Sequence, residues 1–162
     1  ALVGDTVTMT TASDIITGTG VNDTFYGGID DNTAASNTLT AIDILNAGAG
    51  EDTINIVVDT SGAAITFPSF TNSGIETWNI RNVSGQTVTL SGASIADETL
   101  LNSDRSTAAN TFTNVAAGTT IQVNGDSTVA NGATTATFVT GATTGLLNIT
   151  NGVTAGAIAV KG

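Results

Sequence analysis

Residues 47–55 read Ala-Gly-Ala-Gly-Glu-Asp-Thr-Ile-Asn and join a glycine-rich turn to the start of an apolar segment. Gly48 and Gly50 let the backbone turn sharply and direct its carbonyl oxygens inward. Asp52 adds a charged oxygen ligand, and Ile54, two positions later, is expected to point into a strand core. The stretch therefore predicts a tight turn that leads directly into a buried strand, with a carboxylate at the junction.

A looser version of this pattern lies upstream, where residues 22–28 read Asn-Asp-Thr-Phe-Tyr-Gly-Gly. Both stretches resemble the calcium-binding nonapeptide G-G-x-G-x-D-x-U-x of RTX (repeats-in-toxin) proteins. Ala47 and Val21 stand where that family usually has glycine. The resemblance implies bound Ca²⁺, which prefers about six to eight oxygen ligands. A plain Asx/Gly turn between strands is the alternative.

Asp23 and Asp52 are the leading candidate calcium ligands. Other nearby oxygens form a wider candidate set, namely the side chains of Asn22, Asp30, Asp31 and Asp43 and the backbone carbonyls of Gly48 and Gly50. In a parallel β-roll each ion is shared between successive turns, so one motif supplies only half of a site.

The charge distribution favours a cation as ligand. The formal net charge is −11, nine of the fourteen acidic residues precede residue 60, and no Lys or Arg precedes Arg81. Such a segment repels itself unless counter-charge arrives, and bound Ca²⁺ would supply it. A solvated acidic surface is the simpler alternative. Nucleic acid is excluded as an expected partner, because phosphate binding needs a basic face.

The composition predicts an all-β protein, and its short strands with small residues favour a parallel β-solenoid. The resemblance to RTX proteins implies the β-roll or β-helix kind. The 162 residues include 19 Gly and one Pro, and short segments rich in β-branched residues recur between Gly, Asn and Ser. A sandwich or a barrel stays open as an alternative. Expected strands include residues 6–10, 53–58, 75–80, 87–90, 120–123, 136–139, 146–149 and 157–160. We expect a loop over 27–40 and a helical turn over 93–101.

A second resemblance concerns the order of the parts. Residues 73–80, Ser-Gly-Ile-Glu-Thr-Trp-Asn-Ile, follow the glycine turn and its strand, and a Thr/Ala/Gly-rich region comes next. This order is similar to that of RTX-type surface-layer (S-layer) proteins of Gram-negative bacteria. We expect an RTX-like calcium-binding segment at 1–59 and a Thr/Gly/Ala-rich β-solenoid continuation at 60–162, which together form one continuous structural domain. The resemblance implies type I secretion and calcium-dependent assembly into a lattice on the cell surface.

The expected role is structural, and no enzyme is expected. The chain has no His and no Cys, so Ser-His and Cys-His catalysis are absent. A carboxylate pair, as in glycosidases, is one remaining alternative, and a sugar subsite at Glu76 and Trp78 is another. A structural role for these two residues is favoured, in which both side chains share one strand face and cover a sheet edge or a coil end. Arg105 next to Asp104 predicts a surface ion pair.

The expected partner is a second copy of the chain in a surface lattice, and a cell-surface polysaccharide stays open as another partner. No apolar run approaches the ~18 residues of a membrane helix, so no membrane insertion is expected. The chain begins and ends in mid-pattern, so we expect a piece of a longer secreted protein. The alternatives are an RTX adhesin domain, a carbohydrate-binding module, and an accessory β-roll of a secreted enzyme.

Overall fold

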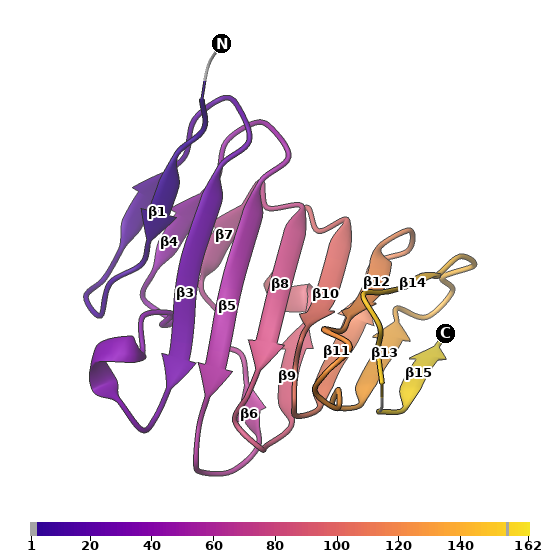
Figure 1. Ribbon diagram of the computed structural model, residues 1–162. Coiled ribbons are helices and arrows are strands. Elements are labelled where there is room, and N and C mark those ends of the chain that lie inside the picture. The colour runs from indigo at the N-terminus through magenta and orange to yellow at the C-terminus, as the bar shows by residue number, and fades with distance from the viewer. Residues whose placement is uncertain (1–2, 155) are drawn as a thin grey trace.

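The computed structural model describes residues 3–154 and 156–162 as a parallel β-solenoid, which confirms the predicted all-β class (Figure 1). Sheet A contains, in spatial order, β1 (Thr6–Thr8), β3 (Thr24–Asp30), β5 (Thr53–Asp59), β8 (Thr77–Asn82), β10 (Leu100–Asp104), β12 (Thr120–Asn124) and β14 (Leu146–Thr150). Sheet B contains β2 (Ile15–Thr17), β4 (Ile44–Asn46) and β7 (Thr71–Ser73). Sheet C contains β15 (Ile158–Lys161), β13 (Thr134–Phe138), β11 (Asn110–Val115), β9 (Val88–Ser91) and β6 (Ile65–Thr66).

The chain winds so that each coil returns to sheet A one strand further along. The early coils alternate between sheets A and B, whereas the later coils alternate between sheets A and C. The coil that starts at β5 contributes to all three sheets, because β6 begins sheet C and β7 ends sheet B. Figure 1 shows the strands of sheet A side by side along the whole molecule. Sheet A is therefore the continuous element on which the other two sheets depend.

Rows of buried side chains fill the interior of the coils. Phe25, Ile54, Trp78, Leu101 and Ile121 occupy successive partner positions on the strands of sheet A. Each of these side chains is fully buried. In a parallel in-register sheet, each apolar side chain packs on the corresponding residue of the next coil, so a coil buries its core only by stacking on its neighbours.

Trp78 corrects one prediction from the sequence. Its side chain is in the centre of the core and does not cover a sheet edge or a coil end. The indole Nε1–H donates a hydrogen bond to the carbonyl of Ile75 at 3.1 Å, and the ring lies 6.0 Å from that of Phe70. The strand begins at Thr77, so Glu76 lies in the preceding turn and shares no strand face with Trp78.

The expected loop over 27–40 is wrong at its start, because β3 continues to Asp30. Gly27 and Gly28 remain in the strand where other parts of the chain approach closely: a Cβ at Gly28 would lie 2.5 Å from the carbonyl oxygen of Ser36. The expected helical turn over 93–101 is also displaced. The structure has a short 3₁₀ helix, η2, at Gly92–Ser94 and the strand β10 from Leu100. The other short 3₁₀ helix, η1, spans Ala34–Ser36.

We expect Trp78→Ala to destabilise the solenoid by about 3–5 kcal/mol, because a large cavity would open between successive core residues. Urea unfolding followed by far-UV circular dichroism measures the loss. Trp78→Phe is the matched control, since it keeps much of the apolar volume and loses only the indole hydrogen bond. Equal stability of Trp78→Ala and the wild type would contradict the central position of this residue.

Candidate functional site

Four acidic residues lie one above another where the chain enters sheet A. Asp5, Asp23, Asp52 and Glu76 immediately precede β1, β3, β5 and β8, and we call this set the carboxylate ladder. Each of the last three side chains accepts a hydrogen bond from the backbone N–H of the ladder residue before it. The N···O distances are 2.5 Å to Asp23, 2.6 Å to Asp52 and 2.7 Å to Glu76. The carboxylates therefore tie successive coils together at this corner.

Asp23 is fully provided with hydrogen-bond donors. Its carboxylate accepts from the backbone N–H of Thr19 at 2.6 Å and from the Thr19 hydroxyl at 2.9 Å, in addition to Asp5 N–H. Burial alone would raise its pKa, but these hydrogen bonds favour the charged form more strongly and lower the pKa of Asp23 overall. Asp23 is thus a stable anion that closes the turn before β3.

Asp52 has the opposite character. Its side chain is fully buried, and Oδ2 has no hydrogen-bond partner among the described residues. The position four residues earlier is Gly48, which lacks the hydroxyl that Thr19 supplies to Asp23. Burial raises the pKa of Asp52 above its ordinary value, and the negative charges of Asp23, Glu76 and Glu51 raise it further. Asp52 is therefore the uncompensated member of the carboxylate ladder.

The glycines beside Asp52 let two turns stack directly. Gly48 has a φ of +101°, and a Cβ there would lie 2.1 Å from the carbonyl oxygen of Thr19. Gly50 has a φ of +139°, and both angles fall in the region that favours glycine. Ala49 N–H donates to the same Thr19 carbonyl at 3.3 Å. The two glycines therefore bring the turn before β5 against the turn before β3.

Asp43 lies at a different corner, where the chain enters sheet B. It precedes β4 and accepts from Asp14 N–H at 3.0 Å, while Asp14 precedes β2. The other Asp43 oxygen accepts from Thr40 N–H at 2.7 Å and from the Thr40 hydroxyl at 3.0 Å. This pair repeats the arrangement of Asp23 and Thr19, and both carboxylate oxygens of Asp43 have donors.

Asp30 and Asp31 lie at the opposite end of β3 from the carboxylate ladder. Asp30 Oδ1 accepts from the backbone N–H groups of Asn32 and Thr33, and Asp31 accepts from those of Ser61 and Gly62. Both acids line an open hollow of about 620 Å³ beside η1.

The eight predicted ligands therefore fall into three groups. The structure brings together Asn22, Asp23, Gly48, Gly50 and Asp52, where the exposed Asn22 accepts from Glu51 N–H at 3.1 Å. It does not bring Asp30, Asp31 or Asp43 to that place. Across residues 3–154 and 156–162, no group of three or more His, Cys, Asp or Glu side chains is close enough to hold a metal ion.

The fit to calcium is thus uneven along the carboxylate ladder. Asp23 has no free oxygen, whereas Asp52 has a buried Oδ2 without a partner, next to the half-buried carboxylate of Glu76. A hard cation is the type of ligand that such an oxygen prefers. Asp52 and Glu76, with carbonyl oxygens of the adjacent glycine turn, are the residues that would hold it.

Asp5, Glu76 and Asp14 were not among the predicted site residues. Their common signal is an acidic residue directly before a strand. In sheet A it is also followed by Thr, as in residues 5–6, 23–24, 52–53 and 76–77. The ladder residues are 18, 29 and 24 positions apart, so no fixed period reveals them.

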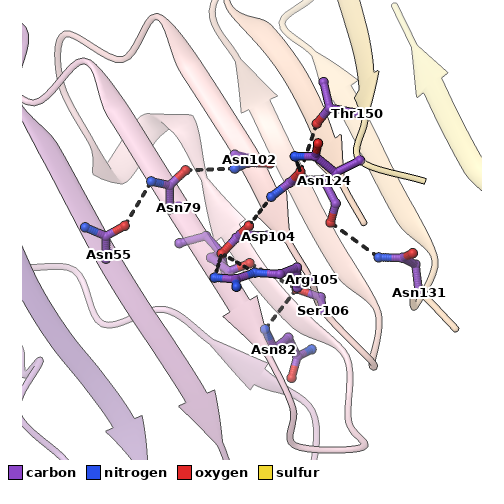
Figure 2. A network of polar contacts seen from close by, with 12 residues as sticks. Asn55, Asn79, Asn82, Asn102, Asp104, Arg105, Ser106, Asn124, Asn131 and Thr150 are labelled. Atoms are coloured by element: carbon purple, nitrogen blue, oxygen red, sulfur yellow. Dashed lines mark hydrogen bonds and ion pairs between the residues drawn. The ribbon is translucent and has the colours of Figure 1, made fainter. Parts of the chain in front are cut away.

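A second row of side chains was also missed, on the outward face of sheet A. Asn55, Asn79 and Asn102 occupy partner positions on β5, β8 and β10, and we call them the amide ladder. Asn79 donates to Asn55 at 2.9 Å and Asn102 donates to Asn79 at 2.8 Å (Figure 2). Stacked amides satisfy one another because each carries both donors and an acceptor.

Comparisons with models of known protein families, with curated protein sequences and with solved structures found no match for this chain. Within the described residues, no helix is long and apolar enough to cross a membrane. The predicted ion pair between Arg105 and Asp104 is confirmed, with a distance of 3.0 Å.

We expect Asp52→Asn to raise the stability of the metal-free protein at neutral pH. Because the pKa of Asp52 is higher in the folded state than in the unfolded state, ionisation of Asp52 destabilises the fold at pH values above its folded-state pKa. This destabilisation shrinks as the pH falls through the folded-state pKa, and it disappears below the unfolded-state pKa of about 3.9. Thermal melts in EDTA across this pH range measure the effect, expected as a few degrees at neutral pH.

Asp59→Asn is the matched control, because Asp59 is exposed and the substitution removes the same unit of charge. The melting temperatures of Asp52→Asn and the wild type should converge on acidification. A destabilising effect of Asp52→Asn at neutral pH in EDTA would contradict the uncompensated state of Asp52.

Proposed function

We propose that this chain is a structural segment of a secreted bacterial surface-layer protein, and that Ca²⁺ bound at the carboxylate ladder stabilises its coils. The observation that carries the proposal is the buried Oδ2 of Asp52, which has no hydrogen-bond partner and faces neighbouring negative charge. Leaving a buried charged acceptor unsatisfied is costly, so a bound cation would offset a cost that the described residues do not.

Among the described residues, no basic side chain lies at this corner. The three basic residues of the chain are Arg81, Arg105 and Lys161. Arg81 lies near the far end of β8, Arg105 follows β10, and Lys161 ends β15. Neutralisation therefore has to come from solution, and Ca²⁺ provides charge together with affinity for carboxylate and carbonyl oxygens.

Calcium binding at the carboxylate ladder would make folding depend on whether the chain is inside or outside the cell. A ligand that binds only the folded state stabilises it by an amount that grows with ligand concentration. Where calcium is scarce, the uncompensated carboxylate of Asp52 weakens the early coils and keeps the chain competent for export. Where calcium is abundant, outside the cell, the ion links turns from adjacent coils and the fold is completed.

Exposed apolar side chains support self-association as the structural role. Leu147 and Ile149 on β14 are in register with the buried Ile121 and Val123, yet they are 47% and 54% exposed. Ile15 and Ile44 are partner residues on the outer face of sheet B and are 76% and 41% exposed. Apolar sheet faces of this kind favour contact with another protein surface.

We expect calcium to raise the melting temperature of the wild-type protein relative to EDTA, when tested at millimolar CaCl₂. Asp52→Asn should remove most of this increase, because it replaces the only fully buried free carboxylate oxygen of the ladder. The control Asp59→Asn should keep the full response. Identical melting temperatures of the wild type with calcium and with EDTA would refute calcium as a structural ligand.

We also expect calcium to promote assembly, visible as oligomers by light scattering and as sheets by electron microscopy. Leu147→Ser should reduce this assembly while it changes the calcium-dependent melting temperature little, since Leu147 is half-exposed. A protein that stays monomeric with calcium and binds a glycan would instead support the adhesin alternative.

A further inference from the structure

A groove crosses the outward face of sheet A over β3, β5, β8 and β10. It has a volume of about 380 Å³, within the range of about 300–1,000 Å³ typical of ligand sites. Its polar and charged lining residues are Tyr26, Asn55, Asn79, Arg81, Asp104 and Arg105. The carboxylate ladder lies where these strands begin, so the groove is a separate feature with its own chemistry.

The groove carries a net positive charge in a strongly acidic protein, because two arginines and one aspartate, Asp104, line it. Arg81 and Arg105 are the only arginines in a chain of net charge −11, and both line it. Among the described residues, Arg81 forms no ion pair. Arg105 pairs with Asp104, but 47% of its side chain remains exposed. Two partly free guanidinium groups at one place favour an anionic ligand, because guanidinium binds carboxylate and phosphate through paired hydrogen bonds.

The amide ladder adds a directed set of hydrogen-bond donors. Asn102 donates to Asn79, which donates to Asn55, so every amide NH₂ in the ladder points toward the first coils (Figure 2). The NH₂ group at the Asn55 end therefore has no further ladder acceptor. At the opposite end, Asn102 Oδ1 is buried without a partner. The ladder thus ends in a free donor within the groove, on the side where Tyr26 lies.

Tyr26 gives the groove an exposed aromatic surface. It is the partner of Asn55 on the neighbouring strand and is 44% exposed. Adjacent strands are about 4.8 Å apart, which is close to the length of one pyranose residue. An aromatic ring, an amide donor and an arginine on successive strands therefore match a chain of sugars laid across the sheet. Aromatic rings present a flat apolar face together with a polar edge.

We propose that this groove binds an acidic oligosaccharide through its carboxylate groups. Arg81 and Arg105 bind the carboxylate, Asn55 donates to a sugar hydroxyl or ring oxygen, and Tyr26 stacks against the apolar face of a pyranose. The groove is open along the sheet, so it accepts a section of a longer chain. None of the lining residues belongs to the carboxylate ladder, so calcium is not a direct ligand in this binding, but it would stabilise the early coils that carry Tyr26 and Asn55.

The test is calorimetric titration of the whole chain with a hyaluronan hexasaccharide at low salt, once in EDTA and once in millimolar CaCl₂, where the early coils are expected to be fully folded. We expect saturable binding that Arg81→Gln weakens by about tenfold or more, as for loss of a charge-assisted hydrogen bond. Lys161→Gln is the matched control, because it removes the same charge from an exposed position on β15; it should bind like the wild type. Tyr26→Ala should also weaken binding, and neutral maltohexaose should bind less tightly than hyaluronan.

Several outcomes would overturn the proposal. Equal affinity of Arg81→Gln and the wild type would show that the groove is not the site, and absence of binding to hyaluronan would exclude a carboxylate-bearing ligand. Binding of mannose 6-phosphate in preference to hyaluronan would assign phosphate as the recognised group and contradict the carboxylate. Unchanged melting temperatures of the variants in EDTA exclude unfolding as the cause of lost binding. Because each variant is compared with the wild type at the same calcium concentration, the effect of Arg81→Gln on binding is measured separately from the calcium-dependent melts.

Discussion

The parallel, in-register pairing of sheet A is the constraint on which the rest of the structure depends. Each residue of a strand lies about 4.8 Å from its partner in the next coil, and the register continues from β1 to β14. Any side chain is therefore stacked on the side chains at the same position in neighbouring coils. Stacking buries apolar side chains against one another, as in the row from Phe25 to Ile121. A row of polar side chains is stable only if its hydrogen-bond donors and acceptors find partners.

The two ladders show how amides and carboxylates meet that condition differently. An amide row is self-complementary, so Asn55, Asn79 and Asn102 need no partner from outside the row to bond one another. A carboxylate row contains acceptors only, and each acid must take its donor from backbone N–H groups or from a threonine hydroxyl. Asp23 has both kinds of donor, but Asp52 has only a single N–H. Beyond Glu76 the position becomes Thr99 and then Thr119, and the repulsion ends there.

Much of the fold could be predicted from the sequence, because short β-branched segments between glycine turns indicate strands whichever coil they belong to. The strands at β5, β9, β12, β13, β14 and β15 were expected within a few residues. The candidate site was less predictable, since it depends on which residues stack. Loops of unequal length separate the coils, so sequence distance did not show that Glu76 lies beside Asp52 while Asp43 lies at another corner. The strand expected over 75–80 begins two residues later, at Thr77, so Glu76 lies in the turn while Trp78 lies in the core.

The same register also keeps the charges of the chain apart. The acids of the carboxylate ladder precede their strands, whereas Arg81 is the fifth residue of β8. Five residues of extended chain separate Glu76 from Arg81, a distance of roughly 16 Å, which exceeds the screening length of about 8 Å at physiological salt. Bending cannot bring the two groups together, because pairing on both sides holds β8 straight. The carboxylate ladder therefore has no basic side chain within reach, and for the same reason the guanidinium of Arg81 forms no ion pair with it. One geometric constraint thus accounts for both proposed ligands, at opposite ends of the same strands.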